Sequence, residues 1–383
     1  MDCRPESLQL KRDQHLFGAG PKRLLALDGG GVRGAISLAF LAEMEAQLRD
    51  RNGPDSVLGD WFDLIGGTST GAIIAAALAL GHRTERIEEF YRERALLVFR
   101  RSIRRIPGLR SRFDAKALMS EIERVVGEKT LASEDLSTGF AVVMKRIDTG
   151  SPWIIANNPR APYWDEAPGK SHIGNRQYRL ADLLRASTAA PLYFDPELIS
   201  IHASQPGALF VDGGITPYNN PSFILFMMAT LKAYRICWPT GVDNLTVVSI
   251  GTGTHRNALL RSSLGFMAPA RLAVHSLRSL MHDTENDALM LMQWLGEPLA
   301  PWRINREIGT LADEIMPGGR LFKFVRYDVR LETDWLADNF DQPISAKQLE
   351  KLREMADPAN IALAYEIGRQ AARRQVKPEH FGL

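Results

Sequence analysis

Short apolar segments that run into glycines are the most regular feature of the hydrophobic pattern. Residues 23–27 (RLLAL) run into Asp28 and a series of glycines, and residues 35–48 then have the apolar spacing of a helix. Residues 61–65 (WFDLI) run in the same way into GGTSTG, and an alanine-rich helical segment follows over 72–80. Two successive strand-to-helix units predict a parallel sheet.

The rest of the chain continues this alternation. Strands are expected at 140–147, 209–211 and 245–250, and helices near 84–99, 115–126 and 221–233. After residue 254 the pattern becomes mainly helical, with helices near 346–355 and 359–373 and one strand candidate at 321–329. We therefore predict a three-layer α/β/α fold with a mainly parallel central sheet over residues 22–254. A mostly helical C-terminal extension, residues 255–383, would pack on this core.

The composition is that of an ordinary globular protein. The 383 residues are 45% hydrophobic and 24% charged, with a formal net charge of +2. No apolar leader follows the charged start, so we expect a cytoplasmic protein. The longest apolar runs, 72–80 and 223–229, are shorter than the roughly 20 residues that cross a bilayer, so membrane contact would be peripheral, at the inner face. Cys3 and Cys237 have neither disulfide-framework nor metal-ligand spacing, and no metal is expected.

The first candidate for chemistry is a serine between two glycines. Residues 67–71 (GTSTG) match G-x-S-x-G, in which a sharp strand-to-helix turn projects a nucleophilic serine, here Ser69 between Gly67 and Gly71. The flanking strand and helix are those that the motif requires. A glycine-rich turn with a solvated serine is the alternative.

The second candidate is the loop at residues 28–34 (DGGGVRG). Gly29, Gly31 and Gly34 also satisfy the dinucleotide fingerprint G-x-G-x-x-G, but the next strand ends in GGTSTG, without the carboxylate that would hold a ribose. We therefore favour hydrolysis, in which backbone amides of this loop stabilise an oxyanion. Arg33 would orient the loop or add positive charge.

The third candidate is Asp212, which follows a short apolar run and precedes Gly213 and Gly214. It is expected at the same sheet edge as the other two loops, where it could act directly as the base for Ser69. An Asx-type turn is the alternative. A Ser-His-Asp triad is a further alternative, because Ser69, Asp212 and His255 follow the chain order of α/β-hydrolases.

Together, DGGGVRG, GTSTG and DGG resemble the patatin-like phospholipase family. Residues 186–191 (ASTAAP), with Tyr193 and Phe194, and residues 219–221 (NNP) are similar to two further segments of that family. The resemblance covers about residues 24–221, so it implies nothing about the C-terminal region.

The resemblance implies a Ser-Asp dyad without histidine, with Ser69 as nucleophile and Asp212 as base. The oxyanion hole would consist of the amides of Gly30, Gly31 and Val32, with Arg33 beside them. The expected substrates are glycerophospholipids or other acyl lipids, with no requirement for calcium or a cofactor. Nucleic acid is not an expected partner, and headgroup, chain position and oligomeric state are left open.

Some bacterial members of the family act as membrane-degrading effectors that cyclic nucleotides switch on in antiphage defence, which makes such an activator an alternative. Residues 94–113 contain seven arginines and no acidic residue. This segment is a candidate surface for anionic lipid headgroups or a phosphorylated ligand. A solvated helix face followed by a loop explains it equally well.

Overall fold

The computed structural model describes residues 8–98, 113–166, 171–203, 205–256 and 269–383. Of the arginine-rich segment, residues 99–112 therefore lie outside the described residues. Within the described ranges, no helix combines the length and apolarity needed to span a bilayer.

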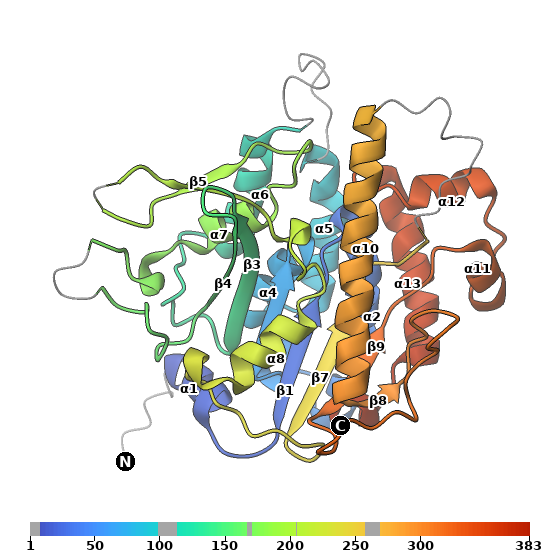
Figure 1. Cartoon of the computed structure of the whole chain (residues 1–383), viewed down its shortest axis with the longest axis horizontal. Coiled ribbons are helices and arrows are strands. Elements are labelled where there is room, and N and C mark those ends of the chain that lie inside the picture. The colour runs from blue at the N-terminus through green and yellow to red at the C-terminus, as the bar shows by residue number, and fades with distance from the viewer. Residues whose placement is uncertain (1–7, 99–112, 167–170, 204, 257–268) are drawn as a thin grey trace.

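A mainly parallel, nine-stranded sheet runs through the middle of the molecule (Figure 1). The strand order is β5-β6-β3-β2-β1-β7-β9-β8, and β4 pairs with β3 outside this path. The strands from β3 through β2, β1, β7 and β9 to β8 are parallel, whereas β4, β5 and β6 pair antiparallel. The strands are β1 (Lys22–Leu27), β2 (Leu64–Thr68), β3 (Gly139–Arg146), β4 (Ser151–Ala156), β5 (Glu197–Ile199), β6 (Ala208–Asp212), β7 (Leu245–Ile250), β8 (Glu297–Ala300) and β9 (Lys323–Tyr327).

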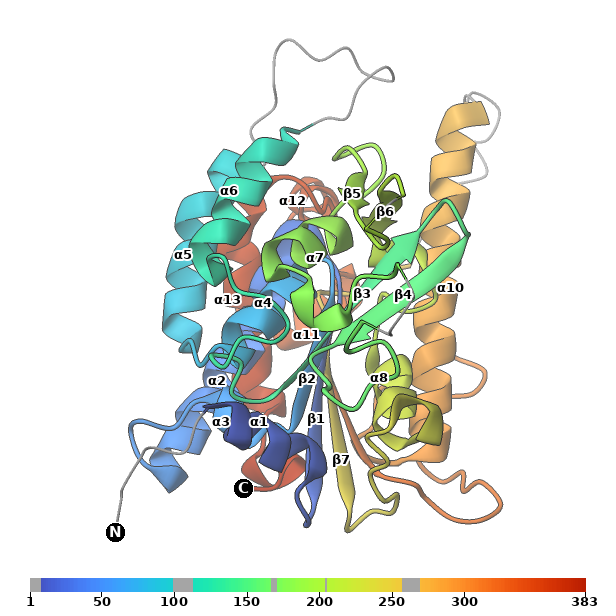
Figure 2. The same cartoon turned by 90° about the vertical axis from the view of Figure 1, so that its left-hand side faces the viewer.

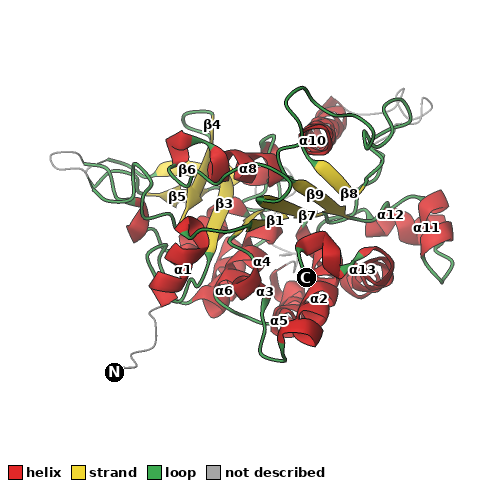
Figure 3. Ribbon diagram, turned by 90° about the horizontal axis from the view of Figure 1, so that it is seen from below, coloured by secondary structure: helices red, strands yellow, loops and turns green. Residues whose placement is uncertain are grey.

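Helices cover both faces of the sheet, which makes the three layers predicted from the sequence (Figure 3). One face carries α2, α4, α5, α6 and α13, and the other carries α8 and the long α10 (Figure 2). The helices are α1 (Leu8–Phe17), α2 (Gly34–Asn52), α3 (Leu58–Trp61), α4 (Thr70–Ala79), α5 (Thr84–Val98), α6 (Ala115–Val126), α7 (Leu180–Ser187), α8 (Ser222–Thr230), α10 (Pro269–Leu295), α11 (Thr333–Asn339), α12 (Ala346–Leu352) and α13 (Ile361–Gln375).

The core lies in two parts, one under each helical layer. Along β1, Leu25 and Leu27 belong to the larger part, and Leu24 and Ala26 belong to the smaller part under α8 and α10. Side chains alternate between the faces of a strand, so both faces of a covered strand must be apolar. This is why RLLAL reads as a continuous apolar run.

The apolar run at residues 61–65 was expected to be a strand throughout, but its first residue, Trp61, ends a short helix. Residues 58–61 form α3, and β2 begins only at Leu64. The Trp61 ring lies 4.0 Å from the Arg23 guanidinium, and its Nε1 donates to the Phe381 carbonyl at 3.0 Å. These long-range contacts of Trp61 are not visible in the local pattern.

Two strands, β2 and β6, pair with successive parts of the same edge of β3. This arrangement brings the candidate site residues together. β4 pairs with β3 along residues 141–146, so it occupies one edge. On the other edge β2 pairs up to Val143, opposite Thr68, and β6 pairs from Met144, opposite Asp212. Because β6 runs antiparallel to β3, its last residue meets the end of β2.

The C-terminal residues contribute to the sheet as well as to the helical layers. β9 pairs with β7 and β8 pairs with β9, while α13 packs along α2. The strand candidate at 321–329 corresponds to β9, and α10 has no counterpart among the helices expected from the sequence. The division into a core of residues 22–254 and an extension of residues 255–383 stays a prediction.

Candidate active site

Ser69 lies in the turn between β2 and α4, in a strained conformation. Its φ is 54° and its ψ is −125°, which is the sharp elbow that exposes a side chain at a sheet edge. The flanking glycines allow this close turn. A Cβ on Gly67 would lie 2.3 Å from the carbonyl of Gly71, and one on Gly71 would lie 2.3 Å from the Leu27 carbonyl oxygen.

The structure places Asp212 beside Ser69. Ser69 Oγ donates a hydrogen bond to Asp212 Oδ2 at 2.7 Å, and the Gly214 amide donates to Oδ1 at 2.7 Å. A Cβ on Gly213 would lie 2.4 Å from the Val143 carbonyl, so glycine lets the loop pass close to β3. Burial raises the pKa of Asp212 to about 6, against the opposing effect of these two hydrogen bonds.

A second serine, Ser187, supports the elbow and was not assigned a role from the sequence. Its Oγ accepts a hydrogen bond from the Ser69 amide at 2.9 Å and donates to the Val143 carbonyl at 2.6 Å. Ser187 is fully buried at the end of α7. It thereby connects Ser69 to β3 independently of Asp212. The sequence signal was the ASTAAP segment, which named no individual residue.

The glycine-rich loop lies directly beside the serine. A Cβ on Gly29 would lie 3.1 Å from Ser69 Cβ, and Gly31 has a φ of +58°. The Gly31 carbonyl accepts hydrogen bonds from Tyr91 Oη and from Thr70 Oγ1. These contacts fix the loop at the start of α2.

Among the described residues, the amides of Gly30 and Gly31 donate to no other group, whereas the Val32 amide donates to the Met355 carbonyl at 2.9 Å. The amides of Gly30 and Gly31 thus have no partner among the described residues, and the oxyanion role of Gly30, Gly31 and Val32 stays a prediction. A Cβ on Gly34 would lie 2.8 Å from Tyr91 Oη, so a small residue is needed there too.

Arg33 and His255 contact each other. Arg33 is 5% exposed, and its Nη1 lies 3.4 Å from His255 Nδ1. Burial, with Arg33 next in effect, lowers the pKa of His255 to about 3. In the part of the chain that the structure describes, His255 forms no hydrogen bond with Ser69 or Asp212. This geometry gives the triad alternative no support.

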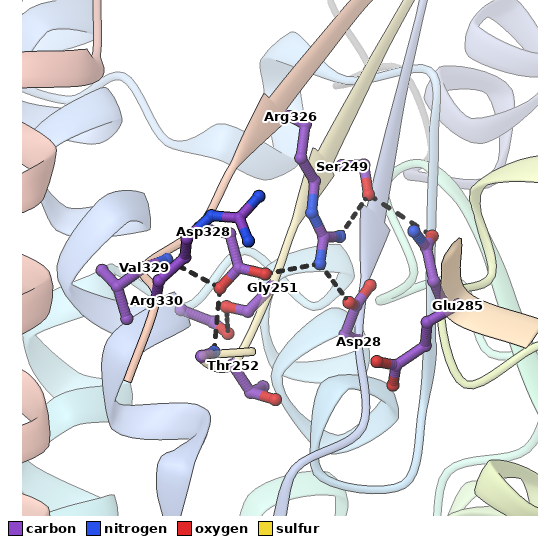
Figure 4. Close-up of polar contacts among 12 residues, drawn as sticks. Asp28, Ser249, Gly251, Thr252, Glu285, Arg326, Asp328, Val329 and Arg330 are labelled. Carbon is purple, nitrogen blue, oxygen red and sulfur yellow. Dashed lines mark hydrogen bonds and ion pairs between the residues drawn. The ribbon is translucent and has the colours of Figure 1, made fainter. Parts of the chain in front are cut away.

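A buried ion-pair cluster anchors the start of the glycine-rich loop (Figure 4). Arg326 Nη2 lies 2.7 Å from both Asp28 Oδ2 and Asp328 Oδ2, and Nη1 donates to Ser249 Oγ at 2.7 Å. Ser249 of β7 pairs in register with Arg326 of β9 on one side and with Ala26 of β1 on the other. Asp28, two residues further on, therefore shares their face of the sheet.

The cluster extends to Gly29 and to α10. Asp328 Oδ1 accepts from the Gly253 amide at 2.8 Å, and in the same loop Thr252 Oγ1 donates to the Gly29 carbonyl at 3.0 Å. Asn219 Nδ2 also donates to the Gly29 carbonyl, at 3.3 Å, and to Glu285 of α10. Burial raises the pKa of Asp28 to about 7, against the opposing effect of Arg326.

An apolar cavity of about 530 Å³ opens at Ser69. It is bounded by α4, α5 and α6 on one side and by α10 on the other, and Asp212 and the glycine-rich loop form part of its wall. Its volume is typical of small-molecule sites. Within the described ranges, no group of three His, Cys, Asp or Glu side chains is arranged to hold a metal ion.

The fold and site define a three-layer α/β/α protein with an elbow serine hydrogen-bonded to a buried aspartate. Residues 25–226 match the family model described as patatin-like phospholipase. The chain therefore belongs to the patatin-like phospholipase family, which confirms the resemblance seen in the sequence. Membership of this family implies a lipid hydrolase.

Similarity to individual proteins supports the same assignment. The chain is 31% identical to a cGAMP-activated phospholipase of Vibrio cholerae over 254 residues, which cover 63% of this chain and 67% of that one. It is 29% identical to patatin group J-1 of Solanum tuberosum over 251 residues, 61% of this chain. The match spans only 60% of the length of that patatin.

Similarity to solved structures is weaker. VipD from Legionella pneumophila is similar with a TM-score of 0.33 and 13% identity, over 93% of this chain and 67% of that one. We draw no conclusion from similarity at this level.

Replacing Arg326 by Met is expected to destabilise the protein by about 3–5 kcal/mol, because two buried carboxylates lose their partner. The free energy of unfolding in urea measures this. Adding Asp28→Asn should restore part of the loss. Arg374→Met is the matched control, since it breaks an exposed pair with Asp341 (2.8 Å) worth about 0–1 kcal/mol. An Arg326→Met variant no less stable than this control would contradict the role given to the cluster.

Proposed function

We propose that this protein hydrolyses the carboxylic ester bonds of glycerophospholipids, as a phospholipase of the A type, through a Ser69–Asp212 dyad. The observation that carries the proposal is the 2.7 Å hydrogen bond from Ser69 Oγ to Asp212 Oδ2. Family membership and the apolar cavity at the serine support a lipid substrate. Peripheral contact with a membrane is part of the proposal.

The first half of the reaction forms an acyl-enzyme. Ser69 Oγ attacks the ester carbonyl carbon while Asp212 Oδ2 takes the hydroxyl proton. The tetrahedral intermediate then collapses, the ester C–O bond breaks, and Asp212 gives the proton to the leaving alkoxide, which departs as a lysophospholipid. A raised pKa makes Asp212 a stronger base than an ordinary aspartate while it remains ionised near neutral pH.

The second half releases the fatty acid. Water attacks the acyl-enzyme, Asp212 takes a proton from it, and Ser69 regains this proton as its ester bond breaks. In both halves the Gly30 and Gly31 amides would donate to the oxyanion, and each such donor typically lowers the barrier by about 3–4 kcal/mol. Both amides lie at the N-terminal end of a short 3-10 helix (Gly31–Arg33) that leads into α2, where the helix dipole also favours negative charge. Calcium has no role in this scheme.

Activation by a cyclic nucleotide is a second candidate property. Its support is the relative whose name is cGAMP-activated phospholipase, with which this chain shares 31% identity. An activator is compatible with the dyad, because it would change the rate without changing the residues that react. Running each assay with and without cGAMP tests it, and equal rates in the two arms would argue against activation by this nucleotide.

Ser69→Ala and Asp212→Asn are each expected to lower fatty-acid release from phospholipid vesicles by at least about 10³-fold, because each removes one member of the reacting pair. The assay contains a metal chelator, and triacylglycerol emulsions serve as a second substrate. His255→Ala is the control and should retain activity, since its ring contacts Arg33. An inactive but folded His255→Ala variant would overturn the dyad in favour of a triad.

The activity is expected to fall as the pH decreases through about 6, because Asp212 must be ionised to accept the proton and its pKa is raised to about 6. Below this value kcat/KM should decrease about tenfold per pH unit, with a plateau above about pH 7. The profile is measured with a soluble ester and repeated for His255→Ala, which should keep the same acid limb. An acid limb centred near pH 4, the ordinary range of aspartate, would contradict the perturbed base.

A further inference from the structure

The cavity at Ser69 continues away from the site along α4. Ile73, Ile74 and Ala77 of α4 line it, and Ile74 and Ala77 are each only 1% exposed. At a rise of about 1.5 Å per residue, Ala77 lies roughly 12 Å from Ser69 along the helix axis. The cavity is therefore long in the direction that leads from the nucleophile toward the C-terminal end of α4.

The opposite walls of this space come from α5 and α6, which pack beside α4 (Figure 2). On α6, Leu118, Ile122 and Val125 follow the i, i+4, i+7 spacing of one helix face. On α5, Ile87 and Phe90 face the same space. Three helices thus turn apolar side chains toward one channel.

The channel becomes polar beyond Ala77, and Tyr91, Arg94 and Glu121 of α5 and α6 also add polar groups to its wall. His82, which follows α4 and so comes after Ala77 in the chain, lines the cavity. Arg86 and Arg124 also lie there. An apolar chain that extended into this end would remove these polar groups from water without giving them a hydrogen-bond partner, which is costly. Such a chain therefore gains no binding free energy by reaching beyond Ala77. The apolar part of the channel therefore has a defined length, from Ser69 to about Ala77.

We propose that this channel between α4, α5 and α6 holds one acyl chain of the substrate, and that Ala77 sets the length of chain that is accepted. The proposal rests on the function proposed above, because the ester carbonyl must lie at Ser69 for the chain to enter here. A linear saturated chain fits the shape, and each methylene buried in an apolar site contributes about fourfold to binding. The apolar part of the channel thus favours esters whose acyl chain fills it over short-chain esters such as butyrate.

The test is the acyl-chain profile of ester hydrolysis. Wild type, Ala77→Val, Ala77→Leu and Ala77→Phe are compared on para-nitrophenyl butyrate, octanoate, laurate and palmitate. The expected result is a stepwise decrease of the palmitate-to-butyrate ratio of kcat/KM with the size of the new side chain. For Ala77→Phe the ratio should fall about tenfold or more, because several methylenes lose their site.

Two further variants guard against misfolding and indirect effects. Val125→Phe narrows the channel from α6, at a partly exposed position that tolerates a larger side chain, and should lower the same ratio. Met119→Phe is the matched control on α6, because Met119 is partly buried but does not line the cavity. An unchanged ratio in Ala77→Phe and Val125→Phe, with Ser69-dependent butyrate hydrolysis, would overturn the channel and leave the proposed function standing.

A binding measurement separates this inference from the proposed function. Palmitate is titrated into Ser69→Ala and into Ser69→Ala/Ala77→Phe by calorimetry. The channel predicts at least about tenfold weaker binding in the double variant. If wild type releases no fatty acid from phospholipid vesicles, with or without cGAMP, the proposed function fails, and this titration still decides on the channel. Equal palmitate affinity in the two proteins, or no binding by either, would overturn it.

Discussion

The edge of β3 that β2 and β6 share is the constraint on which the site depends. β2 ends opposite Val143 and β6 ends opposite Met144, so the residues that follow or close these strands meet. Ser69 follows the end of β2, which is parallel to β3, and Asp212 is the last residue of β6, which is antiparallel to β3. The two residues are 143 positions apart in the chain. Ser187 bonds to the Val143 carbonyl and to the Ser69 amide, which fixes the elbow to the same point. A shift of β6 by one residue would turn Asp212 to the opposite face.

The second constraint is electrostatic and comes from beyond the region of family similarity. That region ends at residue 226, whereas Arg326, Asp328, Glu285 and Met355 all follow it. Arg326, itself paired with Asp328, holds Asp28, and the Met355 carbonyl accepts from the Val32 amide. Glu285 accepts from Asn219, which donates to the Gly29 carbonyl. A buried arginine between two carboxylates is a weak source of net stability but is costly to break. Its position next to the loop suits a role in fixing the geometry of the amides of Gly30 and Gly31.

Local motifs made much of this structure predictable from the sequence. The glycines of GTSTG and DGGGVRG mark turns that no larger residue fits, so the two strand-to-helix units and the candidate residues Ser69 and Asp212 could be read directly. The direction of β6 could not, because antiparallel pairing with β3 depends on contacts far apart in the chain. Ser187 and Arg326 were missed for the same reason: a lone serine or arginine has no local signature. The contacts of Trp61 with Arg23 and with the Phe381 carbonyl are also long-range, so the local pattern of residues 61–65 did not show them.

The central claim is that Ser69 is a nucleophile activated by Asp212. The most direct measurement is the mass of the protein after reaction with a fluorophosphonate, in which a serine oxygen displaces fluoride from phosphorus, followed by peptide mapping. The account predicts one adduct, on Ser69, in wild type and in His255→Ala, and strongly slowed labelling in Asp212→Asn. An adduct on a different residue, or labelling of Asp212→Asn as fast as that of wild type, would contradict it.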